Sequence, residues 1–199
     1  NSSGSVSVEN IRGDVTIQNS YKPVLFRNID GTVTVDSESG SLDGSLVKGD
    51  CIIENSYKDI DIDRVRGSLR IKGNSSSVTA RRIGGDVEVE TSYKSVSVDS
   101  AGGSVSVISQ SGPVQVRDAY GDVAVTTSYK RVILEQIRGN AEIEASSSMV
   151  RAADISGDVS IRSSYKEVDV SAVEGALAIE SKSAPVTASN IGKDVEVST

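Results

Sequence analysis

The chain has 199 residues and a formal net charge of −7, with 28 acidic and 21 basic side chains, one cysteine and no histidine. The acidic balance disfavours nucleic acid and anionic membrane surfaces as partners, and the missing histidine excludes imidazole-based triads and imidazole metal ligands. No apolar run is long enough to span a bilayer and no signal-peptide pattern is present, so we expect no membrane insertion.

From the N-terminus onward, a glycine recurs every 18 residues. We number each 18-residue unit from this glycine as position 1. The next slot in the series holds Lys193, and no residue is inserted or lost between units. The glycines are Gly13, Gly31, Gly49, Gly67, Gly85, Gly103, Gly121, Gly139, Gly157 and Gly175. A fixed period of this length indicates a repeat architecture.

Apolar residues occupy positions 3, 5, 12, 14 and 17 of the units, and Gly44 is the one residue in these columns that is not apolar. Alternation within a unit predicts strands, and the many Val and Ile residues favour them. We expect three short faces at positions 2–6, 11–15 and 16–18, which are residues 14–18, 23–27 and 28–30 of the first complete unit. Units this short must stack to bury an apolar face.

The pattern therefore predicts an all-β, single-stranded β-solenoid (β-helix) with 18-residue turns and about eleven turns. We expect one domain over residues 1–199, either whole or as a slice of a longer array, and a right-handed coil. At ~4.8 Å per turn the rod would be roughly 53 Å long. The position-1 glycine is expected to supply special backbone angles at a corner, and Leu46 is expected to fill part of the slot that Gly44 vacates, through a local bulge.

Outward positions offer a test of the register. Position 15 alternates in sign through Asp63, Arg81, Asp99, Arg117 and Glu135, and opposite charges on paired strand residues stabilise a sheet.

Ser-Tyr-Lys recurs every 36 residues, which is every second turn, and Ser takes the place of Tyr in the turns between, from Ser3 to Ser183. One interpretation is structural: each ring covers the small residue of the neighbouring turn. The other is functional: the edge binds an acidic or sugar polymer, or a neighbouring solenoid, because tyrosine suits carbohydrate stacking. The candidate binding residues are Tyr21, Lys22, Tyr57, Lys58, Tyr93, Lys94, Tyr129, Lys130, Tyr165 and Lys166.

A Gly-Asp pair recurs with the same two-turn spacing, at Asp14, Asp50, Asp86, Asp122 and Asp158. Successive aspartates lie about 9.6 Å apart, too far for one calcium ion to bridge, so we favour Asp as a residue that shapes the corner. We expect no metal and no cofactor. Cys51 lies in a core column without a partner that could activate it. No inserted loops build a cleft, so we expect no enzyme.

The stretch from Gly13 to Gly31 reads Gly-Asp-Val-x-Ile-x-x-Ser-Tyr-x-x-Val-x-x-x-x-Ile-x-Gly. This pattern resembles a bacterial family of adhesin-like β-strand-repeat proteins of unknown function, related to the head domains of autotransporter adhesins. The resemblance covers the whole chain and implies a single-stranded β-helix, an exported or envelope location, and no catalytic residues.

Together these observations favour a non-catalytic extracellular or cell-envelope β-solenoid, adhesin-like or structural, that forms filaments or is part of a longer surface fibre. The alternative is a polysaccharide-binding module that uses the Tyr/Lys edge. The expected partners are the chain itself, end to end or laterally, and a polysaccharide. Neither end of the sequence carries a cap, so we expect open ends.

Overall fold

The computed structural model describes residues 4–199, and every regular element in this range is a β-strand. Two strands form in each 18-residue unit. The odd-numbered strands are β1 (Val6–Ile11), β3 (Val24–Ile29), β5 (Leu42–Val47), β7 (Ile60–Val65), β9 (Val78–Ile83), β11 (Val96–Ala101), β13 (Val114–Ala119), β15 (Val132–Ile137), β17 (Val150–Ile155), β19 (Val168–Val173) and β21 (Val186–Ile191). The even-numbered strands are β2 (Val15–Asn19), β4 (Val33–Ser37), β6 (Cys51–Asn55), β8 (Leu69–Gly73), β10 (Val87–Thr91), β12 (Val105–Ser109), β14 (Val123–Thr127), β16 (Ala141–Ala145), β18 (Val159–Ser164), β20 (Leu177–Lys182) and β22 (Val195–Ser198).

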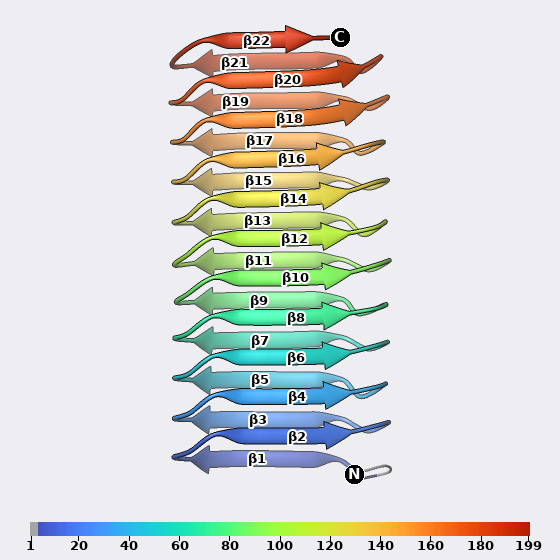
Figure 1. Cartoon of the computed structure of the whole chain (residues 1–199), viewed down its shortest axis with the longest axis vertical. Coiled ribbons are helices and arrows are strands. Elements are labelled where there is room, and N and C mark those ends of the chain that lie inside the picture. The colour runs from blue at the N-terminus through green and yellow to red at the C-terminus, as the bar shows by residue number, and fades with distance from the viewer. Residues whose placement is uncertain (1–3) are drawn as a thin grey trace.

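The strands stack into two 11-stranded parallel sheets, one of odd-numbered and one of even-numbered strands (Figure 1). Each residue pairs with the residue 18 positions further on, as Val96 does with Val114, so the register follows the sequence period. In Figure 1 the chain runs one way along the front sheet and returns along the back sheet while it climbs, which is a right-handed coil. The expected β-solenoid is therefore confirmed. Ser3, at the start of the Tyr/Ser alternation, lies outside the described residues.

The core is the thin layer between the two sheets. It contains the apolar residues of positions 3, 5, 12, 14 and 17, and through the interior turns these are at most a few per cent exposed. Val123 at position 3, for example, is 1% exposed, whereas the neighbouring Ala124 points outward and is exposed. The predicted inward columns are confirmed. Among the described residues none forms a helix that could cross a membrane.

The expected third face at positions 16–18 is wrong, because positions 12–17 form one strand. The residue at position 16 has a positive φ in every turn, from Asn10 at 60° to Asn190 at 56°. This left-handed residue breaks the alternation within the strand, so that positions 12, 14 and 17 all point inward. No β-branched residue occurs at position 16, which agrees with the high strain such residues suffer in this conformation.

The expected role of the position-1 glycine is also wrong, since none of the described glycines has a positive φ. The glycines are required because the backbones of successive turns approach closely at this corner. A Cβ added to Gly49 would lie 2.6 Å from the carbonyl oxygen of Gly31 one turn below. Gly13, with no glycine corner beneath it, would meet nothing within 4 Å.

The vacant slot at Gly44 is filled by Phe26 from the turn below and not by Leu46. A Cβ on Gly44 would lie 2.1 Å from Cζ of Phe26, whose side chain is fully buried. Leu46 is instead the left-handed residue of its turn, with φ 59°, and is partly exposed. The expected local bulge at Leu46 is therefore the bulge that every turn has.

The outward charge columns follow the expected register, but opposite charges that are paired in register do not always form an ion pair. Arg117 and Glu135 are paired residues of β13 and β15 and form an ion pair of 2.6 Å. Arg81 pairs in register with Asp63 and Asp99, but its guanidinium contacts Asp61 at 2.5 Å. Because both charges are exposed, each such pair contributes at most about 1 kcal/mol.

Candidate binding surfaces on two edges

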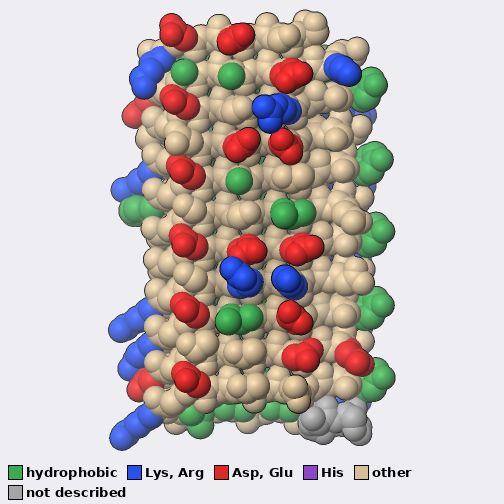
Figure 2. Space-filling view, viewed as in Figure 1, with side chains coloured by type: hydrophobic (Ala, Val, Ile, Leu, Met, Phe, Trp, Pro, Cys, Tyr) green, Lys and Arg blue, Asp and Glu red, His purple; other side chains and the backbone are tan. Residues whose placement is uncertain are grey.

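The Tyr/Lys edge lies at the turns that follow the even-numbered strands. Its five tyrosines are 59–67% exposed and its five lysines are exposed. Figure 2 shows hydrophobic side chains projecting at regular intervals along the corresponding edge of the rod. The rings are largely exposed to solvent, and their cover of the neighbouring turn stays a prediction. At ~4.8 Å per turn, successive rings are about 9.6 Å apart.

The alternation of the two kinds of turn has a packing cause at position 10. Lys occupies this position in one turn, and Gly, Ser or Ala occupies it in the next. The small residues are buried, as Gly40 and Ser76 show. A Cβ on Gly40 would lie 2.1 Å from the carbonyl oxygen of Lys22, and one on Gly112 would lie 1.7 Å from that of Lys94. The small turn therefore packs closely against the backbone of the Lys turn that precedes it. This contact holds the exposed edge in place.

A buried column of small polar residues at position 7 supports the same edge. The side-chain amide of Asn19 donates to the carbonyl oxygen of Lys22 (2.5 Å), and that of Asn55 donates to Lys58 (3.1 Å) and Gly40 (3.1 Å). These bonds tie the lysine backbones to the end of the preceding strand. Sequence reasoning missed this column, although Asn, Ser and Thr recur there at the 18-residue period.

The edge is not uniform along its length. Tyr165 has a positive φ of 68°, unlike the four preceding tyrosines of the edge. Its backbone N–H donates to the carbonyl oxygen of Lys182 at 2.8 Å. Acidic residues follow Lys58 and Lys166 in the chain, whereas Arg131 follows Lys130. The middle of the edge, around Tyr93 and Tyr129, therefore combines exposed rings with the least compensated positive charge.

The Gly-Asp pairs form a column of exposed carboxylates that shapes the opposite corner of the even-numbered sheet. Oδ1 of Asp14 accepts a hydrogen bond from the backbone N–H of Thr32 one turn later (2.8 Å), and Asp50, Asp86, Asp122 and Asp158 accept equivalent bonds. Figure 2 shows acidic side chains at regular intervals near this corner. Within residues 4–199 no group of three or more potential metal ligands occurs, so the structural interpretation of Asp is the one that the contacts support.

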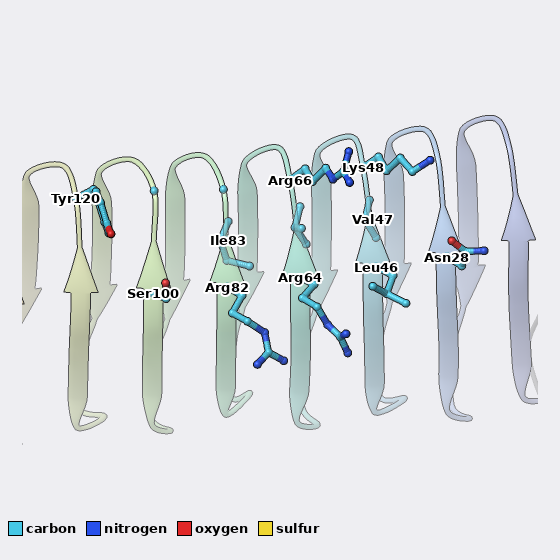
Figure 3. A pocket seen from close by; sticks show the side chains of 13 residues that line it. Asn28, Leu46, Val47, Lys48, Arg64, Arg66, Arg82, Ile83, Ser100 and Tyr120 are labelled. Carbon is cyan, nitrogen blue, oxygen red and sulfur yellow. The ribbon is translucent and has the colours of Figure 1, made fainter.

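A groove of about 560 Å³ lies on the edge opposite the tyrosines, along positions 16 to 18 of several consecutive turns. Its basic residues are Lys48, Arg64, Arg66 and Arg82, and Tyr120 stands at one end. In Figure 3, Lys48 and Arg66 lie near the turns, whereas Arg64 and Arg82 lie on the strands, further from the turns. We call this the basic groove. Sequence reasoning missed it, although Arg64, Arg66 and Arg82 hold positions 16 and 18 of consecutive units.

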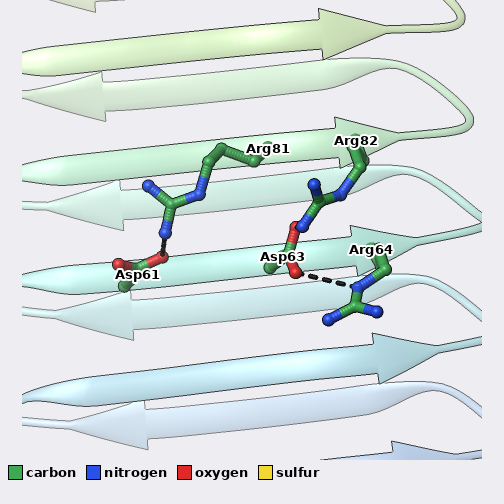
Figure 4. A network of polar contacts seen from close by, with 5 residues as sticks. All are labelled: Asp61, Asp63, Arg64, Arg81 and Arg82. Carbon is green, nitrogen blue, oxygen red and sulfur yellow. Dashed lines mark hydrogen bonds and ion pairs between the residues drawn. The ribbon is translucent and has the colours of Figure 1, made fainter.

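Two residues of the basic groove, Arg64 and Arg82, belong to an ion network on the adjoining strands (Figure 4). Asp63 pairs with Arg64 at 2.9 Å and with Arg82 of the next turn. Partial burial would raise the pKa of Asp63, but the hydrogen bonds and charges of Arg82 and Arg64 outweigh it and hold that pKa below its usual value. Lys48 pairs with Asp30 at 2.7 Å. Two acidic groups therefore face four basic ones.

Cys51 is fully buried in β6, as expected from its core column. Burial, with a smaller contribution from the charge of Asp50, raises the pKa of its thiol to about 12. A thiol that stays protonated and inaccessible is a packing group, because the thiolate is the reactive form.

Comparison with known proteins found no matching family model, no matching curated protein and no matching solved structure. The resemblance to adhesin-like repeat proteins therefore remains a hypothesis drawn from the sequence pattern.

Proposed function

We propose that this chain is a non-catalytic structural rod of an exported, envelope- or surface-exposed protein, and that its turns continue into a longer fibre. The observation that carries this proposal is the unbroken register of the two 11-stranded sheets, in which each turn covers the apolar columns of the turn before it. Leu177 and Ile179 in β20 are 1% and 3% exposed, whereas Val195 and Val197, which pair with them in β22, are 50% and 44% exposed.

The apolar columns thus reach the outer face of β22, which also presents an unpaired strand edge. Exposed edges and open apolar columns favour addition of another strand pair. Either a further turn of the same chain or the end of a second copy would cover this surface. The exported location rests on the adhesin-like sequence pattern, and labelling of intact cells with an impermeant reagent would test it.

The assembly proposal is tested with two variants that each add one negative charge to β22. Val197→Asp places the charge on the apolar column, and Ser198→Asp places it on the next residue, which is also exposed. We expect the parent chain and Ser198→Asp to form longer particles as concentration rises, as measured by light scattering and electron microscopy. Val197→Asp should remain shorter. Particles of one chain at every concentration, or an equal effect of both variants, would overturn end-to-end assembly.

A second candidate function is polysaccharide binding along the Tyr/Lys edge. The supporting observation is a series of tyrosine rings, 59–67% exposed, that repeats every two turns beside exposed lysines. Aromatic faces stack on sugar rings, and a regular array can hold a polymer through many weak contacts at once.

This candidate is tested by pull-down with neutral and acidic polysaccharides. The variant Tyr93→Ala with Tyr129→Ala should bind less than the parent. The matched control replaces Ser75 and Ser111, which hold the same position in the turns between, by Ala and should bind as the parent does. Failure of the parent to bind any of the polymers would exclude this function.

A further inference from the structure

The basic groove carries a concentration of positive charge that is unusual for this chain. Lys48, Arg64, Arg66 and Arg82 line one stretch of it, and the acidic residues that pair with them are Asp30 and Asp63. Arg66 makes no ion pair with any described residue. On a protein with a net charge of −7, a local excess of positive charge attracts an anionic ligand.

Position 16 contributes two of these basic side chains. Leu46, Arg64 and Arg82 hold this position in three consecutive turns with φ of 59°, 58° and 54°. Every turn has this left-handed residue, and five of the other turns place Asn or Asp there. The groove differs from the rest of the column in the length and the positive charge of the side chains of Arg64 and Arg82.

The other half of the groove is uncharged and open. Gly84 and Gly102 hold position 18 in consecutive turns, and a Cβ on either would lie within 2.5 Å of a backbone carbonyl oxygen of the turn below. The hollow between Arg66 and Tyr120 is therefore fixed by backbone packing. The half-buried Ser100 contributes a hydroxyl group to the lining between them.

Tyr120 closes the hollow with a ring held in place from the far side. The guanidinium of Arg138, from the following turn, lies 3.8 Å from the ring centroid and donates a hydrogen bond of 3.0 Å to the hydroxyl. The preceding turn has Gly102 at this position, so the other face of the ring borders the open hollow. Tyr120 is 50% exposed.

We propose that the basic groove binds an acidic oligosaccharide, with uronate or sulfate groups on Lys48, Arg64, Arg66 and Arg82 and a sugar ring against Tyr120. Arginine forks bind carboxylate and sulfate oxygens in pairs, and an aromatic face beside an uncharged floor accepts a sugar ring. The groove runs along the rod over several turns, which suits an extended ligand. This proposal is independent of binding at the Tyr/Lys edge.

The test is a calorimetric titration of the whole chain with a sulfated hexasaccharide, its unsulfated counterpart and a hexaglutamate peptide. We expect binding of the sulfated sugar with one site per chain, weakened by added salt. Arg66→Gln and Arg82→Gln should each weaken it about tenfold, the value of one charged hydrogen bond. The controls Arg151→Gln and Arg162→Gln remove the same charge from exposed positions outside the groove and should bind as the parent does.

Arg82 also pairs with Asp63, so a melting curve must accompany that variant. Arg66→Gln breaks no ion pair and keeps the test decisive. Equal loss in all four arginine variants would show a general charge effect and overturn the site. Equal or tighter binding of hexaglutamate would overturn the choice of a sugar, as would equal binding of the unsulfated hexasaccharide. Absence of binding would overturn the proposal outright. Loss of the titration in the Tyr93→Ala with Tyr129→Ala variant would place the bound sugar at the Tyr/Lys edge and would overturn the proposal as well.

Discussion

The pair Phe26 and Gly44 offers the sharpest test of how the core is packed. Phe26 is fully buried, and its ring fills the core space that Gly44, which has no side chain, leaves open in the next turn. Truncation by Phe26→Val leaves a cavity, and because Phe→Ala in a core costs about 3–5 kcal/mol, we expect a loss of about 2–3 kcal/mol. Gly44→Val forces a side chain into the ring, 2.1 Å from Cζ at the Cβ alone, and overpacking of this kind costs about 1–3 kcal/mol.

The double variant should restore a regular column, because Val at both positions repeats the pattern of the neighbouring turns. We expect it to be less destabilised than the sum of the single variants by about 2 kcal/mol, within the range of about 0.5–3 kcal/mol that contacting residues show. The assay is urea unfolding followed by circular dichroism, with the free energies of unfolding arranged as a double-mutant cycle. Single-variant costs that add to within about 0.5 kcal/mol would refute the packing.

Leu46→Ala is the control for this cycle. The partly exposed Leu46 should lose no more than about 1 kcal/mol, since the large values come from fully buried side chains. If Leu46 filled the slot at Gly44, its truncation would cost about 2–5 kcal/mol.

Four further outcomes are expected. Leu46→Asn should raise the free energy of unfolding by about 1 kcal/mol, because Asn tolerates the left-handed conformation at φ 59°; a lower melting temperature would contradict this. Val123→Asp should unfold several turns because it buries an unpaired charge, whereas Thr16→Asp on the exposed face should change stability by no more than about 0.5 kcal/mol; equal losses in thermal melts would reverse the inside and the outside. Asp122→Ala should cost about 1 kcal/mol by removing a 2.7 Å hydrogen bond to the next turn, Asp122→Asn should retain most of it, and a chelator should leave both melts unchanged. Cys51, whose thiol pKa is raised to about 12, should resist maleimide in the folded chain, and prompt labelling would place the thiol at the surface. Because the thiol ionises at a lower pH in the unfolded chain, the stability that Cys51 contributes should be fully present below pH 9 and fall as pH rises towards 12.

The sequence predicted the coil, its register and its inward columns because these depend on periodicity alone. It did not predict the two-sheet cross-section, because that depends on the φ of position 16, where Arg64 and Leu46 give no sign of a left-handed backbone. The absence of β-branched residues from that column was the available signal. The Tyr/Lys edge was placed correctly, but the exposure of its rings depends on side-chain packing that a repeat spacing does not specify.

The basic groove escaped sequence reasoning for a related reason. It forms where Gly84 and Gly102 fall at position 18 of consecutive turns, beside Arg82 and the basic residues of the two turns before it. The doubled glycines at 84–85 and 102–103 were visible in the sequence. They became informative once the stacking placed them between Arg66 and Tyr120.

The close contact between Gly40 and the carbonyl oxygen of Lys22 has a consequence for how such a rod can change in length. A Lys-type turn fits against the small turn that follows it, in which position 10 is buried whether it is Gly, Ser or Ala. A second Lys-type turn in its place would have to bury a lysine side chain there. Duplication or loss of a single turn would create this mismatch at the new junction, whereas gain or loss of 36 residues would preserve every contact. The inheritable unit of length is therefore the pair of turns, and related rods should differ in reach by even numbers of turns.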